Sequence, residues 1–450
     1  MEKIEKTIID NDFLIDDIYV FTKNNYSFLL GKNGTSMIVS SDILNNIKNK
    51  ELNENLKIKL LNHGLAELKD FGISISKNES NNIYFIIDVT KRCNFDCIYC
   101  FRNLEDKSVI DNKTLEEICK YILNIVEERE MKSVTIQVWG GEPLLALDKI
   151  EYIYNFFHNT NINLFIDVET NGSLITEEVA KKLKDMNISV GVSLDGNESQ
   201  QNKQRKLVDG KPTSDLVIKG IENLRKYYGD TIGGITVITK YNYQDIDKII
   251  DYFVNKLNIH SMKFNIVRDN PNAMEENIGL NKDEIKTFAN NLYDTVKAYN
   301  RLGVDFHEDN IKVRYDNLME RANSNYCCSR GCSGGINIIS FDSKGNIYPC
   351  EMIDYENVKI GSIYHDDNVS DNKSFIEQVS IAKKNNIYFK KKINKECDNC
   401  PWYYYCKGGC TSRILYSKGK MKYDEVECEF NKVIYERLVN DILDDIGKDN

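Results

Sequence analysis

Three closely spaced cysteines are the residues of this chain with the clearest chemistry. Cys93, Cys97 and Cys100 form a C-x3-C-x2-C array within the stretch DVTKRCNFDCIYCF. Three thiolates at this spacing suit a cubane [4Fe–4S] cluster, in which each corner iron takes one sulfur, better than a zinc site, which needs four protein ligands. One iron is then open to a substrate or cofactor. A zinc knuckle or half of a ferredoxin site is the alternative interpretation of these cysteines alone.

A second set of nine cysteines lies in the C-terminal third of the chain. Its members are Cys327, Cys328, Cys332, Cys350, Cys397, Cys400, Cys406, Cys410 and Cys428. Two patterns order them, C-x12-G-x4-C from Cys332 through Gly345 to Cys350, and C-x2-C-x5-C-x3-C from Cys397 to Cys410. Zinc ribbons also use paired C-x2-C groups, but so many cysteines beside a first array favour iron and sulfur over zinc.

The composition indicates a soluble globular protein of two or three domains. The chain has 450 residues, of which 41% are hydrophobic and 28% charged, and this is too apolar for a disordered chain. No apolar run approaches the roughly 20 residues that span a bilayer. The N-terminus MEKIEKTIIDND is charged where a signal peptide would be apolar. We therefore expect a cytoplasmic protein without a membrane partner.

The expected cytoplasmic location and the negative net charge of the chain limit its possible functions. A reducing cytoplasm disfavours disulfides, so the clustered members of the 13 cysteines are expected to bind metal. Cys119, at helical spacing in ICKYIL, is expected to be a buried core thiol instead. A net charge of −10 and a pI near 5.3 argue against a surface that neutralises phosphates, so nucleic acid is not an expected partner.

Strands alternating with helices are predicted from residue 82 onward. The expected strands cover residues 83–89, 134–138, 164–168, 189–194, 235–239 and 262–266. The first helix is expected near 114–128, opened by a capping box that begins at Thr114. Six strand–helix units predict an α/β fold with a partial (β/α)6 TIM barrel, in which the chemistry lies at the C-terminal ends of the strands.

The first 80 residues predict a smaller α+β unit. Strands are expected at 18–22, 27–30 and 36–39, separated by the turn sequences KNN and GKNG. Short helices follow, one capped by Ser41 and one covering 54–62. This order indicates a winged-helix-like module. A simple N-terminal cap on the barrel is the alternative.

The cysteine patterns resemble those of radical S-adenosylmethionine (SAM) enzymes with a SPASM extension. The C-x3-C-x2-C array is similar to the one that binds SAM through an open iron, and Tyr99 belongs to the same pattern, which implies that it packs near the adenine. In the SPASM resemblance, Cys332, Cys350 and Cys410 plus an upstream thiol, Cys327 or Cys328, hold auxiliary cluster I. The same resemblance implies that Cys397, Cys400, Cys406 and Cys428 hold auxiliary cluster II. The implied cofactors are SAM and three [4Fe–4S] clusters.

Residues at the predicted strand ends complete the resemblance. They are Gly140, Gly141, Glu142 and Pro143 after the second strand, Glu169 and Asn171 after the third, and Ser193, Asp195 and Arg205 after the fourth. The first group looks like the family's motif for the SAM amino group, and Ser193 and Arg205 are implied to hold its carboxylate and ribose. Gln201 departs from the pattern, since relatives often carry histidine there. No catalytic residue is assigned beyond the cluster ligands.

The resemblance implies three domains and a function. Residues 1–80 would recognise a leader peptide, 81–315 form the radical SAM barrel, and 316–450 form the SPASM domain. The enzyme would cleave SAM reductively to a 5′-deoxyadenosyl radical, with a flavodoxin or ferredoxin as electron donor. It would form thioether cross-links in a ribosomally synthesised, cysteine-containing precursor peptide, as sactipeptide synthases do.

Two alternatives remain open at the level of sequence. One is an anaerobic sulfatase-maturating enzyme, which oxidises cysteine to formylglycine and normally lacks the first 80 residues. The other is a non-catalytic Fe–S electron carrier or scaffold, which has no use for the strand-end motifs.

Overall fold

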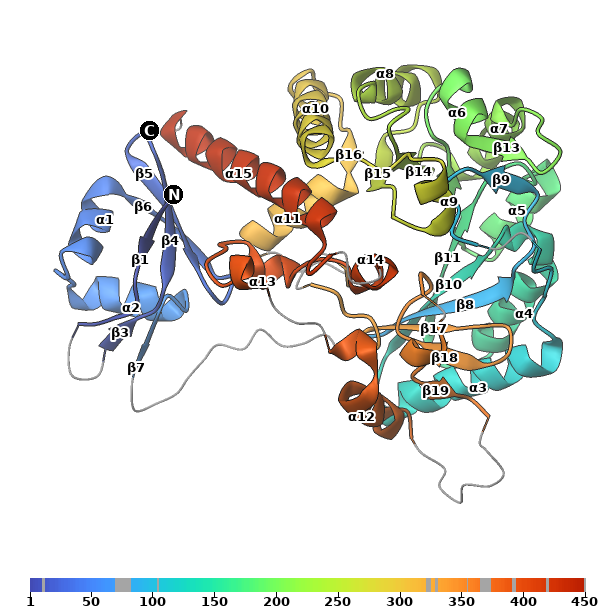
Figure 1. Cartoon of the computed structure of the whole chain (residues 1–450), viewed down its shortest axis with the longest axis horizontal. Helices are drawn as coiled ribbons and strands as arrows, with labels where there is room; N and C mark the ends of the chain where they lie inside the picture. Colours follow the sequence, from blue (N-terminus) through green and yellow to red (C-terminus); the bar gives the residue numbers. More distant parts are fainter. Residues whose placement is uncertain are drawn as a thin grey trace.

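The computed structural model describes most of the chain. The described residues are 1–9, 13–68, 82–102, 105–320, 325–327, 331–353, 355–364, 374–390, 394–417 and 421–448. A small N-terminal unit lies at one end of the molecule, and a large sheet with its covering helices lies at the other (Figure 1).

A ten-stranded sheet with the order β16-β15-β14-β12-β11-β10-β8-β17-β18-β19 runs through the larger part. Its six central parallel strands are β8 (Tyr84–Thr90), β10 (Ser133–Gly140), β11 (Asn163–Thr170), β12 (Ser189–Ser193), β14 (Gly233–Ile238) and β15 (Ser261–Ile266). Branched apolar side chains such as Ile136, Val138 and Val168 are buried, as in parallel strands covered by helices. The predicted α/β fold with a partial (β/α)6 barrel is confirmed.

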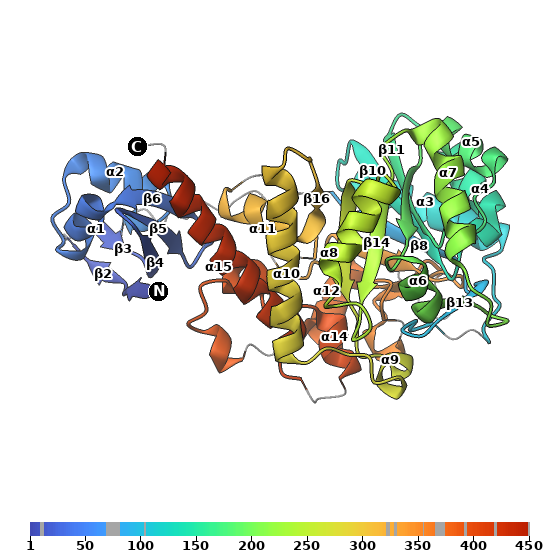
Figure 2. The same ribbon diagram turned by 90° about the horizontal axis from the view of Figure 1, so that it is seen from above.

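Helices cover the outer face of this sheet, as Figure 2 shows for α4, α5 and α7. The helices of this region are α3 (Asn112–Glu128), α4 (Leu147–His158), α5 (Glu177–Asp185), α6 (Glu198–Gln204), α7 (Ser214–Tyr228), α8 (Ile246–Asp251), α9 (Pro271–Glu275), α10 (Lys282–Arg301) and α11 (Asp309–Leu318), with a 3-10 turn at Pro143–Ala146 and a π turn at Tyr252–Lys256. Cys119 of α3 is fully buried, as expected of a core thiol. Of the helices in the described part of the chain, none has both the length and the apolar character of a membrane span.

The predicted capping box at Thr114 is wrong. Helix α3 begins two residues earlier, and its cap is Asp111, whose side chain accepts a hydrogen bond from the Thr114 amide at 2.9 Å. The Thr114 hydroxyl donates to the same carboxylate at 2.8 Å. The charged oxygens of Asp111 therefore satisfy the free amide at the helix start that Thr114 was expected to satisfy.

Strands from the C-terminal region extend the barrel sheet, which the sequence analysis did not anticipate. β17 (Ile338–Phe341) pairs in parallel with β8, the first barrel strand. β18 (Asn346–Tyr348) and β19 (Gly361–Ser362) follow in antiparallel order, and β16 (His307–Glu308) extends the opposite edge beyond β15. The remaining C-terminal elements are α12 (Phe375–Asn385), α13 (Tyr403–Cys406), α14 (Thr411–Tyr416), α15 (Glu425–Lys448) and 3-10 turns at Glu356–Val358, Ile387–Phe389 and Lys395–Cys397.

The N-terminal unit has its own sheets and its own apolar core. Its main sheet has the order β1-β4-β5-β6, with β1 (Glu2–Ile4), β4 (Ile18–Lys23), β5 (Tyr26–Gly31) and β6 (Ser36–Ser40), and β2 (Thr7–Ile8), β3 (Phe13–Ile15) and β7 (Ala66–Leu68) form a second sheet. Helices α1 (Ser41–Lys48) and α2 (Glu54–Asn62) pack against them. The three predicted strands are present as β4, β5 and β6. The predicted cap Ser41 is the first helical residue, because the Ser40 side chain caps α1.

The long helix α15 connects the two parts of the molecule. It packs against α10 and α11 on one side and against β4 and β5 of the N-terminal unit on the other (Figures 1 and 2). The Trp402 ring stacks on Tyr435 of α15 with ring centroids 4.9 Å apart, and on Phe21 of β4 at 5.1 Å. Near the end of α15, the Lys23 ammonium pairs with Asp444 at 2.6 Å.

Candidate active site

The first cysteine array lies on a short ribbon at the C-terminal end of β8. Strand β9 (Phe95–Cys97) pairs antiparallel with β13 (Arg205–Leu207), and this register sets Arg205 opposite Cys97. All three thiols, Cys93, Cys97 and Cys100, are half-buried. Burial raises the pKa of the Cys93 thiol to about 11, and it also raises the pKa of Cys97, although the nearby Arg205 guanidinium opposes that shift.

Glycines let the second strand end approach the cysteine loop closely. A Cβ on Gly141 would lie 2.2 Å from the Arg92 carbonyl oxygen, and one on Gly140 would lie 2.6 Å from the Thr90 carbonyl oxygen. The Gly141 amide donates to Thr90 at 2.7 Å, and the Glu142 amide donates to Arg92 at 2.8 Å. The backbone between Thr90 and Cys93 is therefore held by a loop that needs glycine for steric reasons.

The Glu142 side chain joins three parts of the barrel mouth. Its carboxylate accepts hydrogen bonds from the Thr170 hydroxyl at 2.6 Å, the Asn171 amide at 2.7 Å and the Leu144 amide at 3.1 Å. Burial raises the pKa of this carboxyl, and the three donors oppose that shift. Glu142 thus fixes the loop after β10 against the end of β11, and Pro143 is buried at the start of the following 3-10 turn.

Asn171 connects the third strand end to the cysteine loop. Its side-chain amide donates to the Asn94 oxygen at 2.9 Å, next to Cys93. Its own oxygen accepts from the Ser173 amide at 3.0 Å and the Ser173 hydroxyl at 2.7 Å. The predicted strand-end residue therefore orients the loop that carries the thiols.

Asp195 is fully buried, and its carboxylate binds the polar groups around Tyr99. The Tyr99 hydroxyl donates to Asp195 Oδ2 at 2.5 Å, and Arg205 Nε lies 3.1 Å from the same oxygen. The Arg205 guanidinium also lies over the Tyr99 ring, 5.3 Å from its centroid. Gln201, the departure from the family pattern, is buried and accepts from the Asp195 amide at 3.0 Å. Its role in this structure is to support the Asp195 loop.

One cavity of about 820 Å³ lies between the two cysteine sets. From the barrel it is lined by Tyr99, Cys100, Glu169, Ser193, Arg205, Lys263 and Arg268, among others, and from the C-terminal region by Tyr326, Cys327, Glu351 and Met352. The structure therefore brings four predicted cofactor-binding residues together with one cysteine of each set. The lining residues do not include Gly140, Gly141, Glu142, Pro143, Asn171 or Asp195, which hold the lining groups in place.

Three cysteines of the C-terminal set face one another beside this cavity. The Cys332 sulfur lies 3.0 Å from the Tyr388 hydroxyl, the Cys350 sulfur lies 3.4 Å from the Ser412 hydroxyl, and both thiols interact electrostatically with Cys410. Burial raises the pKa of Cys350 and of Cys410. Cys327 is exposed and lines the cavity. Cys328 lies outside the described residues.

The other four cysteines form a separate group near the start of α15. The Cys428 thiol interacts with Cys400 and Cys397, and the Tyr403 ring lies close to Cys397 and Cys406. Burial raises the pKa of Cys428 to about 11. In the part of the chain that the structure describes, no three His, Cys, Asp or Glu side chains surround a single metal position.

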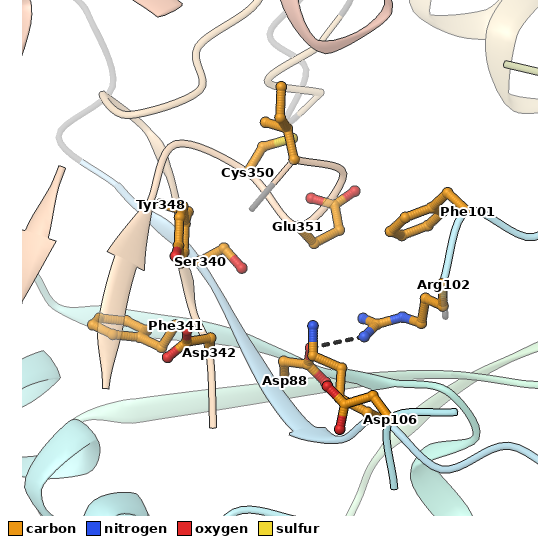
Figure 3. A pocket seen from close by; sticks show the side chains of 12 residues that line it. Asp88, Phe101, Arg102, Asp106, Ser340, Phe341, Asp342, Tyr348, Cys350 and Glu351 are labelled. Atoms are coloured by element: carbon orange, nitrogen blue, oxygen red, sulfur yellow. Dashed lines mark hydrogen bonds and ion pairs between the residues drawn. The ribbon is translucent and has the colours of Figure 1, made fainter. Parts of the chain in front are cut away.

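A smaller pocket of about 180 Å³ lies between the first cysteine loop and Cys350. Figure 3 shows Cys350 and Glu351 on one side of it and Phe101 and Arg102 on the other. Arg102 pairs with the buried Asp88 at 2.8 Å, which ties the residues after Cys100 to strand β8.

Arg102, Glu351 and Arg268 line the two cavities and were not predicted from the sequence. Each has a local signal: Arg102 and Glu351 follow proposed ligands closely, and Arg268 follows the sixth barrel strand.

Comparisons with known proteins show which proteins this chain is similar to. A family model described as the radical SAM superfamily matches residues 87–253. The chain is 29% identical over 371 residues to a cysteine-type anaerobic sulfatase-maturating enzyme of Clostridium novyi, covering 78% of this chain and 93% of the relative. It is 30% identical over 273 residues to an uncharacterised protein of Methanocaldococcus jannaschii, covering 60% of this chain and 85% of the relative.

Two solved structures share the fold. Native anSMEcpe with bound AdoMet and the Cp18Cys peptide superimposes with a TM-score of 0.68 at 24% identity, and the match covers 81% of this chain and 99% of that one. Streptococcus suis SuiB bound to the precursor peptide SuiA superimposes with a TM-score of 0.54 at 16% identity, and that match covers 94% of this chain and 99% of SuiB.

Proposed function

Since this chain belongs to the radical SAM superfamily, whose members bind SAM and a [4Fe–4S] cluster, we propose that it modifies a cysteine-containing precursor peptide by joining a cysteine sulfur to a carbon atom. The product is a thioether cross-link within a ribosomally made peptide. The observation that carries this proposal is the cavity of about 820 Å³ that Cys100 and Cys327 line from opposite cysteine sets. A peptide in that cavity lies between the two sets.

The residues at the barrel mouth fit the family's cofactors. Cys93, Cys97 and Cys100 offer three half-buried thiols as ligands, and Ser193 and Arg205 offer a hydroxyl and a guanidinium in the same cavity. Tyr99 presents its ring there, fixed by its hydrogen bond to Asp195. When bound, SAM and a reduced cluster supply hydrogen-atom abstraction. The proposal includes an external flavodoxin or ferredoxin as the electron donor.

The C-terminal cysteines form the second half of the proposed site. Cys332, Cys350 and Cys410, with Cys327 or Cys328, would hold one auxiliary [4Fe–4S] cluster. Cys397, Cys400, Cys406 and Cys428 would hold the other. The electrostatic interactions among Cys332, Cys350 and Cys410, and those of Cys428 with Cys397 and Cys400, support this assignment.

Forming a thioether breaks one carbon–hydrogen bond and one sulfur–hydrogen bond and makes one carbon–sulfur bond. The peptide therefore loses a hydrogen atom, a proton and an electron, and the electron needs an acceptor, for which the proposed auxiliary clusters are suited. The Glu351 carboxylate lines the cavity next to Cys350 and is placed to accept the proton.

The N-terminal unit supports a precursor with a leader segment. Strand β6 is the last strand of its sheet, and beside it lies a hollow of about 460 Å³ lined by Met37, Ile38 and Met319, among others. The Ser36 amide and carbonyl at the start of β6 already bond to Glu320 and His63. Beyond Ser36, an extended peptide can add to the outer edge of β6 and place apolar side chains in such a hollow. SuiB, whose structure was solved with a precursor peptide, matches 94% of this chain, whereas anSMEcpe matches 81%. We propose residues 1–80 as the leader-binding domain, 81–315 as the catalytic barrel and 316–450 as the auxiliary-cluster domain.

A second candidate function is sulfatase maturation, in which a cysteine becomes formylglycine. The relative from Clostridium novyi, which carries that name and shares 29% identity over 93% of its length, favours this candidate. The two functions differ in the fate of sulfur, because a thioether keeps the sulfur atom and formylglycine loses it.

Mass spectrometry of the peptide separates the two functions. The reconstituted enzyme is incubated with SAM, dithionite and a cysteine-containing peptide encoded beside its gene. We expect a product lighter by two hydrogen atoms that no longer reacts with iodoacetamide, and no such product from the Cys→Ser peptide. A product that has lost sulfur and gained a carbonyl would favour sulfatase maturation. SAM cleavage with no change to either peptide substrate would contradict both.

A further inference from the structure

A single arginine lies where the cavity meets the C-terminal cysteines. Arg268 follows strand β15, and its side chain lines the cavity. Cys327 and Glu351 line the same cavity as Arg268. The thiols of Cys410, Cys350 and Cys327 and the Glu351 carboxylate interact electrostatically with its guanidinium. Its Nη1 atom is buried and has no hydrogen-bond partner among the residues that the structure describes. A buried guanidinium without full pairing is costly, so this position requires counter-charge.

The backbone around Arg268 is held from both sides. The carbonyl of Val267 accepts from the guanidinium of Arg413 at 2.8 Å, and Arg413 is buried and paired with Asp424 at 3.1 Å. The Asp424 carboxylate also accepts from the Cys410 amide at 3.1 Å. On the other side, the Asn270 side chain donates to the carbonyls of Arg268 and Tyr99. The arginine is therefore fixed relative to both cysteine sets.

The Glu351 carboxylate supplies one negative charge beside Arg268. Cysteines bind iron as thiolates, so a cluster held by Cys332, Cys350 and Cys410 would add further negative charge next to the guanidinium. A cation fixed beside an Fe–S cluster favours the more negative, reduced state of the cluster, because net charge and hydrogen bonds around the sulfurs set the reduction potential.

We propose that Arg268 balances the charge of the cluster held by Cys332, Cys350 and Cys410, and so raises the reduction potential of that cluster. This inference rests on the proposed function, since it requires an auxiliary cluster there. Arg268 is a positioning residue in this role, and it makes the cluster nearest the cavity the better electron acceptor. The electron released when the thioether forms then has a defined destination.

Lys263 provides a matched control for Arg268. It lies on β15, lines the same cavity and carries a positive charge, and it interacts electrostatically with the Glu169 carboxylate. Lys263→Gln removes a cavity cation without removing the one beside the cluster. Arg268→Gln removes the charge beside the cluster, and Arg268→Lys keeps the charge with a different shape.

The test is an EPR-monitored redox titration of the iron-loaded enzyme without SAM or peptide, with iron content measured in parallel. We expect Arg268→Gln to shift the midpoint potential of one auxiliary signal to a more negative value. The midpoint potential of Arg268→Lys should lie between those of Arg268→Gln and the unmutated protein. Lys263→Gln should leave the midpoint potential of that signal unchanged. Loss of one cluster from Arg268→Gln alone, with both other variants fully loaded, would also support charge balance.

Three results would overturn the inference or its premise. Equal potentials for Arg268→Gln and Lys263→Gln would remove the role of Arg268. Equal midpoint potentials for Arg268→Gln and Arg268→Lys would show that the charge of residue 268 does not set the reduction potential. An unmutated enzyme that binds only one cluster would instead overturn the proposed function on which the inference rests.

Discussion

At the scale of single residues, the candidate site depends on contacts that leave no room for substitution. The glycines after β10 meet the backbone of the cysteine loop, and the buried carboxylates of Glu142 and Asp195 each bind groups from several strand ends. Altering such a residue should move a proposed cofactor ligand without removing it.

Gly141→Ala should abolish SAM cleavage. The added Cβ would lie 2.2 Å from the Arg92 carbonyl oxygen, which is backbone and adjacent to Cys93, so the cysteine loop must move. The matched control is Gly233→Ala in β14, where no atom lies within 4 Å of the added Cβ. Formation of 5′-deoxyadenosine under dithionite is the measurement, with circular dichroism to verify folding. Equal activity of the two variants would contradict this account of the loop.

Single replacements of Cys327 and Cys328 should have unequal effects. Cys327 lines the cavity and faces Arg268, and side chains of successive residues diverge, so both sulfurs cannot reach one cluster in the same way. We expect Cys327→Ala to open an iron of auxiliary cluster I and Cys328→Ala to change little. Mössbauer spectra of the two variants, with and without peptide, provide the measurement. A peptide sulfur bound to that iron in the unmutated protein would show that neither cysteine completes the cluster.

At the scale of elements, the N-terminal unit presents two separable properties, its stability and the outer edge of its last strand, β6. Its stability depends partly on Asp17, which is buried and pairs with Lys32 and with Lys3. The edge of β6 and the adjacent hollow are where we propose that the leader binds. Each property has its own prediction.

Asp17 should make the N-terminal unit sensitive to acid. Burial of this carboxyl acts to raise its pKa. The Lys32 side chain and the Lys6 amide outweigh burial and lower the pKa to about 2. In the unfolded chain the pKa of this carboxyl is near 4, so the ionised group stabilises the fold at any pH above about 4. This contribution, on the order of 2 kcal/mol, is lost as the pH falls toward 2. Asp17→Asn should remove that dependence. Amide hydrogen exchange of β4 and β5 in metal-free protein across this range checks it, and identical profiles for both proteins would refute the role of Asp17.

Met37→Asp should weaken binding of the precursor about tenfold, or roughly 1.4 kcal/mol. Met37 lines the hollow beside β6, and a carboxylate there is costly to desolvate when an apolar leader side chain binds. The control is Ile58→Asp, because Ile58 is 52% exposed on α2 and does not line the hollow. Fluorescence anisotropy of a labelled precursor gives both affinities. Equal weakening by both variants would argue against leader binding at this edge, and substrate-free SAM cleavage should stay unchanged in both.

At the scale of the whole molecule, the N-terminal unit and the barrel are joined through the C-terminal region. The ring of Trp402 lies between Phe21 and Tyr435, and the Tyr405 hydroxyl donates to the Gly34 carbonyl at 2.8 Å. Trp402 and Tyr405 lie between Cys400 and Cys406 in the chain. This segment therefore fixes the proposed leader site relative to the cavity.

Trp402→Ala should loosen the N-terminal unit from the rest of the protein. Trp402 is 2% exposed, and replacing a buried aromatic side chain with alanine costs about 3–5 kcal/mol. Small-angle scattering should show a larger radius of gyration, and precursor modification should fall more than substrate-free SAM cleavage. Phe165→Ala serves as the control, since Phe165 is 55% exposed. An unchanged radius for Trp402→Ala would rule out this joining role.

The barrel was predictable from sequence because its parallel strands are short apolar runs that end in glycine and polar residues. The spacing of Cys93, Cys97 and Cys100 was visible because these three cysteines share one short stretch of chain. The pairing of β17 with β8 was not predictable, because no local pattern records which distant strand completes an edge. Glu351 and Arg268 were missed for a related reason. Each stands beside a proposed ligand or a strand end, but the sequence does not show which distant groups it meets when the C-terminal region folds over the barrel mouth.

The pairing of β17 with β8 has a consequence for synthesis on the ribosome. The first barrel strand gains this neighbour only after residues 338–341 have been made, although the strands on its other side follow soon after it. Domains generally begin to fold from the N-terminus during translation, and an unpaired apolar edge invites association with other chains. The nascent barrel therefore exposes one edge of β8 for most of its synthesis. Chaperone contact during translation is expected to concentrate at that edge, and a ribosome stalled before residue 338 should hold the chain in its most aggregation-prone form.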